Sequence, residues 1–179
     1  MAPGLKLYTI GHGTAPIEDF IGWLQSFGID ALVDVRRFAG SRRNPQYNSG
    51  ELAKSLSDAG IAYRNDVALG GRRKPSPDSR NIGLRNEAFR AYADYMETPE
   101  FHEAFEHLLE QARNEQIVIM CSETVWWRCH RRLVSDAAVL LADGEVEHIV
   151  AGIARPHIPT EGVRRDGNDL RYGTGALGV

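Results

Sequence analysis

The chain has 179 residues and a mass of 19.9 kDa, with 42% hydrophobic and 25% charged residues, which is typical of one globular domain and excludes global disorder. A formal net charge of −3 and a pI near 6.1 exclude a uniformly basic surface for nucleic acid. No apolar run approaches the ~18 residues that span a bilayer, no signal-peptide core follows Met1, and two cysteines are too few for a disulfide scaffold, so we expect a cytoplasmic protein without a membrane segment.

The predicted elements of the first half alternate between strand and helix. A short β-type run at 5–10 ends in a glycine-rich turn, and helical spacing of apolar residues follows over 17–27. The nearly continuous apolar run at 31–35 is typical of a strand buried on both faces. A helix is expected over 52–59 and the next strand over 61–63.

The second half begins with a long loop over 67–86, which is too polar and too rich in Gly and Pro for the core. In chain order we then expect a helix over 86–97, a helix capped by Thr98, a strand over 117–120, a helix over 126–141 and a strand over 146–149. This alternation predicts an α/β fold, a three-layer sandwich with a mainly parallel central sheet. Residues 1–155 would form a single domain, and 156–179 a C-terminal extended arm or hairpin packed on it and frayed after about Tyr172.

Cys121 follows the strongest predicted strand directly and precedes a predicted helix. Ligands of α/β sheets bind at the carboxyl ends of strands, and a helix N-terminus with nearby arginines lowers the pKa of a thiol. A buried structural thiol is the alternative. We predict Cys121 as nucleophile or sulfur carrier, with Arg128 stabilising negative charge and Glu123 or His130 moving protons.

Cys129 falls within the predicted helix over 126–141, so a core thiol is the first interpretation. A resolving cysteine and a metal ligand are its rival roles. Cys121, Cys129, His130 and His12 together can supply a tetrahedral set of ligands, but their spacing matches no standard zinc pattern. We therefore predict neither a metal nor a cofactor and keep a Cys/His metal site as an alternative.

Of the 21 basic residues, 18 are arginine, and many of these fall in loops after predicted strands. A genome rich in G and C explains such a preference, and so does a shared anion site, because the guanidinium fork matches phosphate and carboxylate oxygens. Arg36 either pairs with Asp34 or reaches an anion. The predicted anion- or substrate-binding residues are His12, Arg36, Arg42, Arg43, Asn44, Tyr47, Arg72, Trp127 and Arg131.

Six motifs in order carry a family resemblance: Tyr8-Thr-Ile-Gly-His-Gly, Leu32-Val-Asp-Val-Arg, Ser41-Arg-Arg-Asn-Pro-Gln-Tyr-Asn, Leu69-Gly-Gly-Arg, Phe89-Arg-Ala-Tyr-Ala-Asp-Tyr-Met, and Cys121-Ser-Glu through Trp127-Arg-Cys-His-Arg. Over about residues 5–172 the chain resembles the family called domain of unknown function 488. The resemblance implies an α/β sandwich without an established general function.

A more distant likeness is to rhodanese and tyrosine-phosphatase domains, in which a strand ending in Asp-x-Arg precedes a later strand, cysteine loop and helix. Asp34-Val-Arg36 and Cys121 fit that order. Those enzymes place an arginine six positions after the cysteine, where this chain has Trp127, with Arg128 one later. The likeness therefore assigns neither sulfur transfer nor phosphate ester hydrolysis.

Three functions remain open from the sequence. The first is a thiol-dependent enzyme, sulfurtransferase-like or hydrolase-like, with an arginine-lined pocket for a small anionic or nucleotide-like ligand. The second is a non-catalytic nucleotide or nucleic-acid binding module that uses the arginine loops, with Tyr47, Trp126 and Trp127 stacking on bases. The third is a protein with a Cys/His metal site.

Overall fold

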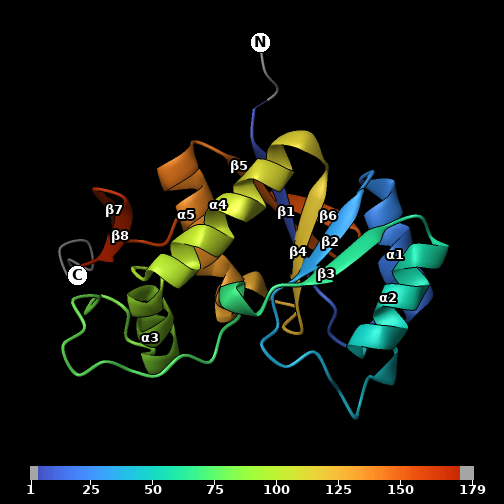
Figure 1. The fold of residues 1–179 in the computed structure, drawn as a ribbon, viewed down its shortest axis with the longest axis horizontal. Helices are drawn as coiled ribbons and strands as arrows, with labels where there is room; N and C mark the ends of the chain where they lie inside the picture. Colours follow the sequence, from blue (N-terminus) through green and yellow to red (C-terminus); the bar gives the residue numbers. More distant parts are fainter. Residues whose placement is uncertain (1–3, 174–179) are drawn as a thin grey trace.

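The computed structural model describes residues 4–173, which build a six-stranded sheet covered by helices on both faces (Figure 1). The strands are β1 (Lys6–Gly11), β2 (Ala31–Asp34), β3 (Ala62–Asn65), β4 (Ile117–Cys121), β5 (Glu145–Val150) and β6 (Ile153–Pro156). Their order is β3-β2-β4-β1-β5-β6; the first five are parallel, and β6 is antiparallel to β5. The expected α/β fold with a mainly parallel sheet is confirmed.

The helices form two layers, one on each face of the sheet. They are α1 (Ile17–Ser26) and α2 (Ser49–Asp58) on one face, and α3 (Glu87–Tyr95), α4 (Pro99–Asn114) and α5 (Arg131–Ala142) on the other (Figure 1). Each face of the sheet has its own hydrophobic core, and successive side chains of β1 point to opposite faces. Leu7 packs in the core with α4 and α5, and Tyr8 packs in the core with α1. Among residues 4–173, no helix has the length and apolar character needed to cross a membrane.

Strands β1 and β4 lie side by side, but the chain leaves them towards opposite faces of the sheet. The connection after β1 runs through α1, and the connection after β4 runs through α5, which lies on the other face. Such a reversal opens a crevice at the carboxyl edge of a parallel sheet. Gly11 pairs with Cys121 in register, so the turn containing His12 and the end of β4 meet at this crevice, as expected.

The prediction of a helix over 126–141 is wrong at the N-terminal end of that helix. Residues Trp126–Arg128 form a single 3₁₀ turn, and α5 begins only at Arg131. The indole of Trp126 stacks on the ring of His148 at 4.1 Å, and this tertiary contact competes with helix formation. Cys129 therefore precedes the helix instead of lying within it.

The C-terminal part contributes one strand that the sequence analysis missed and one hairpin that it expected. The missed strand, β6, is a short and mostly exposed edge strand, so it has no alternating apolar face. The hairpin consists of β7 (Val163–Asp166) and β8 (Asp169–Tyr172). The expected fraying after Tyr172 falls on residues 174–179, which lie outside the described residues.

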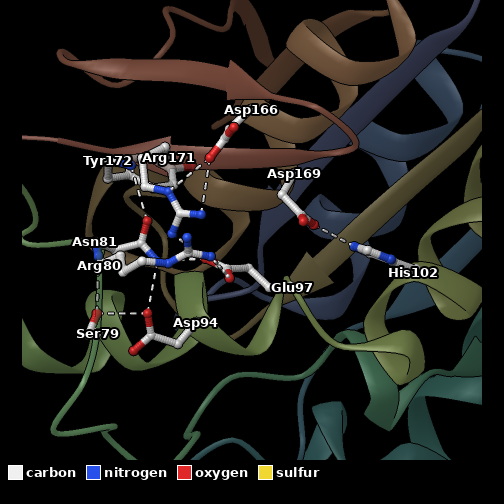
Figure 2. A network of polar contacts seen from close by, with 10 residues as sticks. All are labelled: Ser79, Arg80, Asn81, Asp94, Glu97, His102, Asp166, Asp169, Arg171 and Tyr172. Carbon is white, nitrogen blue, oxygen red and sulfur yellow. Dashed lines mark hydrogen bonds and ion pairs between the residues drawn. The ribbon is translucent and has the colours of Figure 1, made fainter.

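Polar contacts fix the hairpin to the helical layer of α3 and α4 (Figure 2). Buried Arg171 pairs with Glu97 at 2.7 Å and with Asp166 at 3.2 Å. Asp169 meets His102 of α4 at 2.8 Å. The arm is thus a packed part of the domain and holds the helices that wall the crevice.

Candidate functional site

A cleft of about 530 Å³ opens at the carboxyl edge of the sheet, above the ends of β1, β2 and β4. Its walls come from the turn after β1, the loop after β2, the long loop before α3, α3 itself and the segment after β4. The predicted site residues that line it are His12, Arg36, Asn44, Arg72, Cys121, Glu123, Arg128 and His130. Parallel strands thus bring together loops that are far apart in the sequence.

The other predicted residues lie around this cleft and not on its walls. Tyr47 and Arg131 are buried beneath it. Trp127 is half exposed and packs edge-on against Trp126. Arg42 and Arg43 are exposed, and Arg42 lines a separate shallow hollow.

The floor of the cleft is a pair of thiols. The Sγ atoms of Cys121 and Cys129 are 2.8 Å apart, both cysteines are reduced, and both line the cleft although they are largely buried. The 3₁₀ turn after β4 folds Cys129 back onto Cys121. Sequence reasoning placed Cys129 within a helix as a core thiol, with a resolving cysteine as a rival role; the structure places this buried thiol before the helix and next to Cys121.

Arg131 lies directly behind this thiol pair. Its side chain is 1% exposed, and its Nε donates to the Sγ of Cys121 at 3.0 Å. Nη1 donates to Thr9 Oγ1 at 3.0 Å, and Nη2 donates to the carbonyl oxygen of Glu123. Because these acceptors are neutral oxygens, the sulfur pair is the group in contact with Arg131 that can carry a compensating negative charge.

Burial and hydrogen bonding split the acidities of the two thiols. Burial raises the pKa of Cys121 well above its ordinary value, and the hydrogen bond to Cys129 adds to this effect. Burial also opposes ionisation of Cys129, but the Cys121 thiol, His130 and Arg131 outweigh it and bring the pKa of Cys129 well below its ordinary value. The two pKa shifts run in opposite directions, so Cys129 is the more acidic thiol of the pair.

The turn after β1 and the loop after β4 lie in close backbone contact. A Cβ on Gly11 would lie 1.8 Å from the carbonyl oxygen of Glu123, so only glycine fits there. Gly13, with φ +50°, is similarly covered by the side chain of Thr124. The chain's own loop after β4 thus fills the space beside both glycines.

His12 and Arg36 form a second wall of the cleft. Arg36 makes a forked ion pair with Asp34 at 2.9 and 2.7 Å, so the ion-pair interpretation of this motif holds. Its Nη1 lies 3.3 Å from Nε2 of His12, whose Nδ1 donates to Gly13 at 2.8 Å. Burial lowers the pKa of His12 to about 4, and its neutral ring stacks on Tyr47 at 4.1 Å.

The mouth of the cleft carries an exposed aromatic ring between two cations. Phe38 is 64% exposed, and the guanidinium carbons of Arg37 and Arg72 lie 5.9 and 5.6 Å from its centroid. Arg72 has φ +58°, which is strained for a residue with a side chain, and its carbonyl accepts from Arg37 at 2.7 Å. Sequence reasoning missed Phe38 and Arg37, although an aromatic residue in an arginine-rich loop was a visible signal.

A buried chain of hydrogen bonds leads away from Arg131 on the side opposite the thiols. Thr9, which accepts from Arg131, donates to His148 at 2.6 Å, and His148 donates to His157 at 2.9 Å. His157 donates to Asp136 at 2.8 Å. This chain positions the guanidinium, and no spacing in the sequence indicated it.

His130 is the side chain at the cleft whose hydrogen bonding is incomplete. Its Nδ1 lies 3.5 Å from the Sγ of Cys129, and its buried Nε2 has no partner among the described residues. Residues 4–173 contain no group of three or more His, Cys, Asp or Glu side chains placed to hold a metal ion. His12, Cys121, Cys129 and His130 therefore do not form the ligand set of the metal-site alternative.

The chain matches one protein-family model. The family model "Domain of unknown function DUF488" matches residues 16–138, which is more than half of the chain. The matched segment contains both cysteines, Arg36 and Arg131. No curated protein and no solved structure shows significant similarity to the chain.

Proposed function

The chain belongs to the DUF488 family, a domain of unknown function, and we propose that this member is a thiol-dependent enzyme that acts on a small anionic substrate. The observation that carries the proposal is the thiol pair on the cleft floor, backed by the buried guanidinium of Arg131 at 3.0 Å from Cys121. A buried cation beside the thiol pair favours the loss of one proton from the pair, and the thiolate is the nucleophilic form of cysteine.

In this proposal Cys129 supplies the attacking thiolate, and Cys121 stabilises it by donating the hydrogen bond at 2.8 Å. This reassigns the nucleophile that the sequence placed at Cys121, because Cys129 is the thiol whose pKa is lowered. His130, 3.5 Å from Cys129 Sγ, is placed to pass a proton to a leaving group. Glu123 is exposed at the edge of the cleft and accepts from the backbone N–H of Val125.

The charges around the cleft favour an anion. Arg37, Arg72 and Arg128 line it without a carboxylate partner among the described ion pairs, whereas Glu123 is the acidic residue on the same wall. Guanidinium groups attract anionic ligands into a cleft and hold them by forked hydrogen bonds. The exposed Phe38 ring offers a stacking surface, which favours a substrate with a planar group, such as a nucleotide.

Paired alkylating reagents test this proposal, because iodoacetate is anionic and iodoacetamide is neutral. For each state of the protein we take the ratio of the iodoacetate labelling rate to the iodoacetamide labelling rate. We expect this preference for iodoacetate to be higher at a cleft cysteine of the native protein than in the urea-unfolded chain. Arg128→Ala should reduce this preference about three- to tenfold. Arg155→Ala, on exposed β6 and away from the cleft, is the matched control and should leave it unchanged. Equal preferences in native and unfolded protein would overturn the proposal.

The aromatic ring at the cleft mouth favours a second candidate, a non-catalytic module that binds nucleotides or single-stranded nucleic acid. Phe38 would stack on a base, while Arg72 and exposed Arg42 and Arg43 would contact phosphates. Fluorescence anisotropy of a labelled oligonucleotide tests it. Binding that weakens steeply with salt and is lost in Phe38→Ala supports this candidate, and absence of binding at low salt contradicts it.

A further inference from the structure

We propose that Cys121 and Cys129 form a reversible disulfide by exchange with an anionic, low-molecular-weight disulfide, which gives this protein a thiol–disulfide exchange activity. The inference deepens the proposed function and rests on it, since it needs the same thiolate and the same cleft. It adds the class of substrate and a separate role for the second cysteine.

The geometry of the thiol pair supports this chemistry. The two sulfur atoms are 2.8 Å apart in the reduced protein, and neither cysteine is covalently bonded. Both lie on the cleft wall, so a substrate sulfur that reaches Cys129 also lies next to Cys121. A hydrolase needs one thiol and an attacking water, whereas a second thiol in contact with the first intercepts any disulfide formed there.

The reaction proceeds in two balanced steps. The Cys129 thiolate attacks one sulfur of the substrate disulfide, RSSR; a Cys129–S–S–R bond forms, the substrate S–S bond breaks and RS⁻ leaves. Cys121, after losing its proton to the departing thiolate or to His130, attacks the Sγ of Cys129. The Cys121–Cys129 disulfide forms and a second RS⁻ leaves. The protein is oxidised by two electrons and the substrate is reduced to two thiols.

The walls of the cleft favour a disulfide that carries carboxylates. Arg72 and Arg128 line the cleft above the two thiols, and the volume of about 530 Å³ suits a small-molecule ligand. Each RS⁻ that leaves is also an anion, so the same cations stabilise the developing charge on the leaving sulfur. A neutral disulfide lacks the attraction of its own carboxylates to these cations and gains only the stabilisation of the leaving thiolate.

Arg131 makes the resulting disulfide easy to reduce again. In this proposal its buried guanidinium faces a thiol pair with one negative charge in the reduced protein, and neutral sulfur in the oxidised protein. Stabilising the reduced form of a dithiol raises its reduction potential, which is typical of catalytic and not of structural disulfides. Excess RSH therefore returns the protein to the dithiol.

Mass spectrometry with oxidised glutathione, an anionic disulfide, tests this inference. The reduced wild-type chain should lose two hydrogen atoms and release two glutathione thiols, and Cys121→Ser should instead stop at glutathione bound to Cys129. Arg128→Ala should slow the reaction with glutathione disulfide about three- to tenfold more than the reaction with neutral hydroxyethyl disulfide. Arg155→Ala should behave as wild type with both.

Two results would overturn the inference, and they separate it from the proposed function. If wild type accumulates a stable mixed disulfide, or does not react, while iodoacetate still labels the cleft cysteine preferentially, the exchange activity is wrong and the thiol-dependent cleft stands. If the iodoacetate preference is absent as well, both fall.

Discussion

The Nε of Arg131 donates to the Sγ of Cys121 at 3.0 Å, across ten positions of sequence and with both groups buried. Phosphatase- and rhodanese-like patterns place their arginine six positions after the cysteine, where this chain has half-exposed Trp127. The 3₁₀ turn at Trp126–Arg128 brings Cys129 to within 2.8 Å of Cys121. The segment after β4 therefore presents a thiol pair with a buried arginine behind it.

Replacing Arg131 with lysine keeps a positive charge but loses the fork that reaches Cys121, Thr9 and Glu123 together. We expect the apparent pKa of thiol labelling to rise by about one unit and the free energy of unfolding to fall by about 2–4 kcal/mol. A pH series of bromobimane labelling and urea unfolding measures both. Arg132→Lys, at a neighbouring arginine that contacts Thr160, is the control; an equal shift of the thiol pKa there would contradict this role of Arg131.

His12 should make the protein sensitive to mild acid. Its pKa is about 4 in the folded chain, because of burial, and about 6.5 in the unfolded chain, so the unfolded state binds more protons between these values. The stabilisation is complete above pH 6.5 and is lost as pH falls towards 4, by about 2–3 kcal/mol. Urea unfolding at pH 7 and pH 5 should show a smaller loss in His12→Gln. The same loss in both proteins would contradict the assignment.

The fold was predictable because it depends on local patterns. Continuous apolar runs at 31–35 and 117–120 mark strands buried on both faces, and parallel strands necessarily bring their carboxyl ends to one edge. His12, Arg36 and Cys121 converge there for that reason. Strand β6 was missed because its residues are mostly exposed and show no pattern of apolar burial. Its antiparallel pairing with β5 defines it as a strand.

The inner part of the site was less predictable, because tertiary contacts decide it. Stacking of Trp126 on His148 replaces the first turns of the expected helix, and this moves Cys129 from a helix core to the cleft. Arg131 was expected near the thiol and as a ligand of an anion, and it contacts the thiol from inside the protein. Buried histidines such as His148 and His157 have no periodic signal that would connect them to it.

Gly11 should tolerate no side chain. A Cβ at this position meets backbone atoms of Glu123 and Thr124 at 1.8 and 2.8 Å, and backbone cannot move aside as a flexible side chain can. We expect Gly11→Ala to lower the free energy of unfolding by about 2–4 kcal/mol and to slow thiol labelling, because the loop after β4 must shift. Gly22→Ala, in α1 with open space around its Cβ position, is the control and should be neutral or stabilising. Equal stability of the two variants would show that the loops do not touch.

We expect Arg72 to favour anion binding at a small cost in the stability of the fold. Its φ of +58° is unfavourable for a side chain and free of strain for glycine. Arg72→Gly should therefore leave the free energy of unfolding unchanged or raise it by up to about 1 kcal/mol, while it weakens the preference for iodoacetate about threefold. Thermal unfolding and alkylation rates check the two effects. A clear loss of stability would mean that the arginine side chain supports the fold.

The most direct test of the thiolate–thiol pair is peptide mapping of alkylation against pH in the native, reduced protein. Cys129 should be labelled first, with an apparent pKa clearly below the ordinary value of about 8.5, and Cys121 should resist labelling until the chain unfolds. Cys121→Ala should raise the apparent pKa of Cys129 labelling, because alanine removes the donating thiol. Labelling of both cysteines together at an ordinary thiol pKa, or of Cys121 before Cys129, would contradict the account.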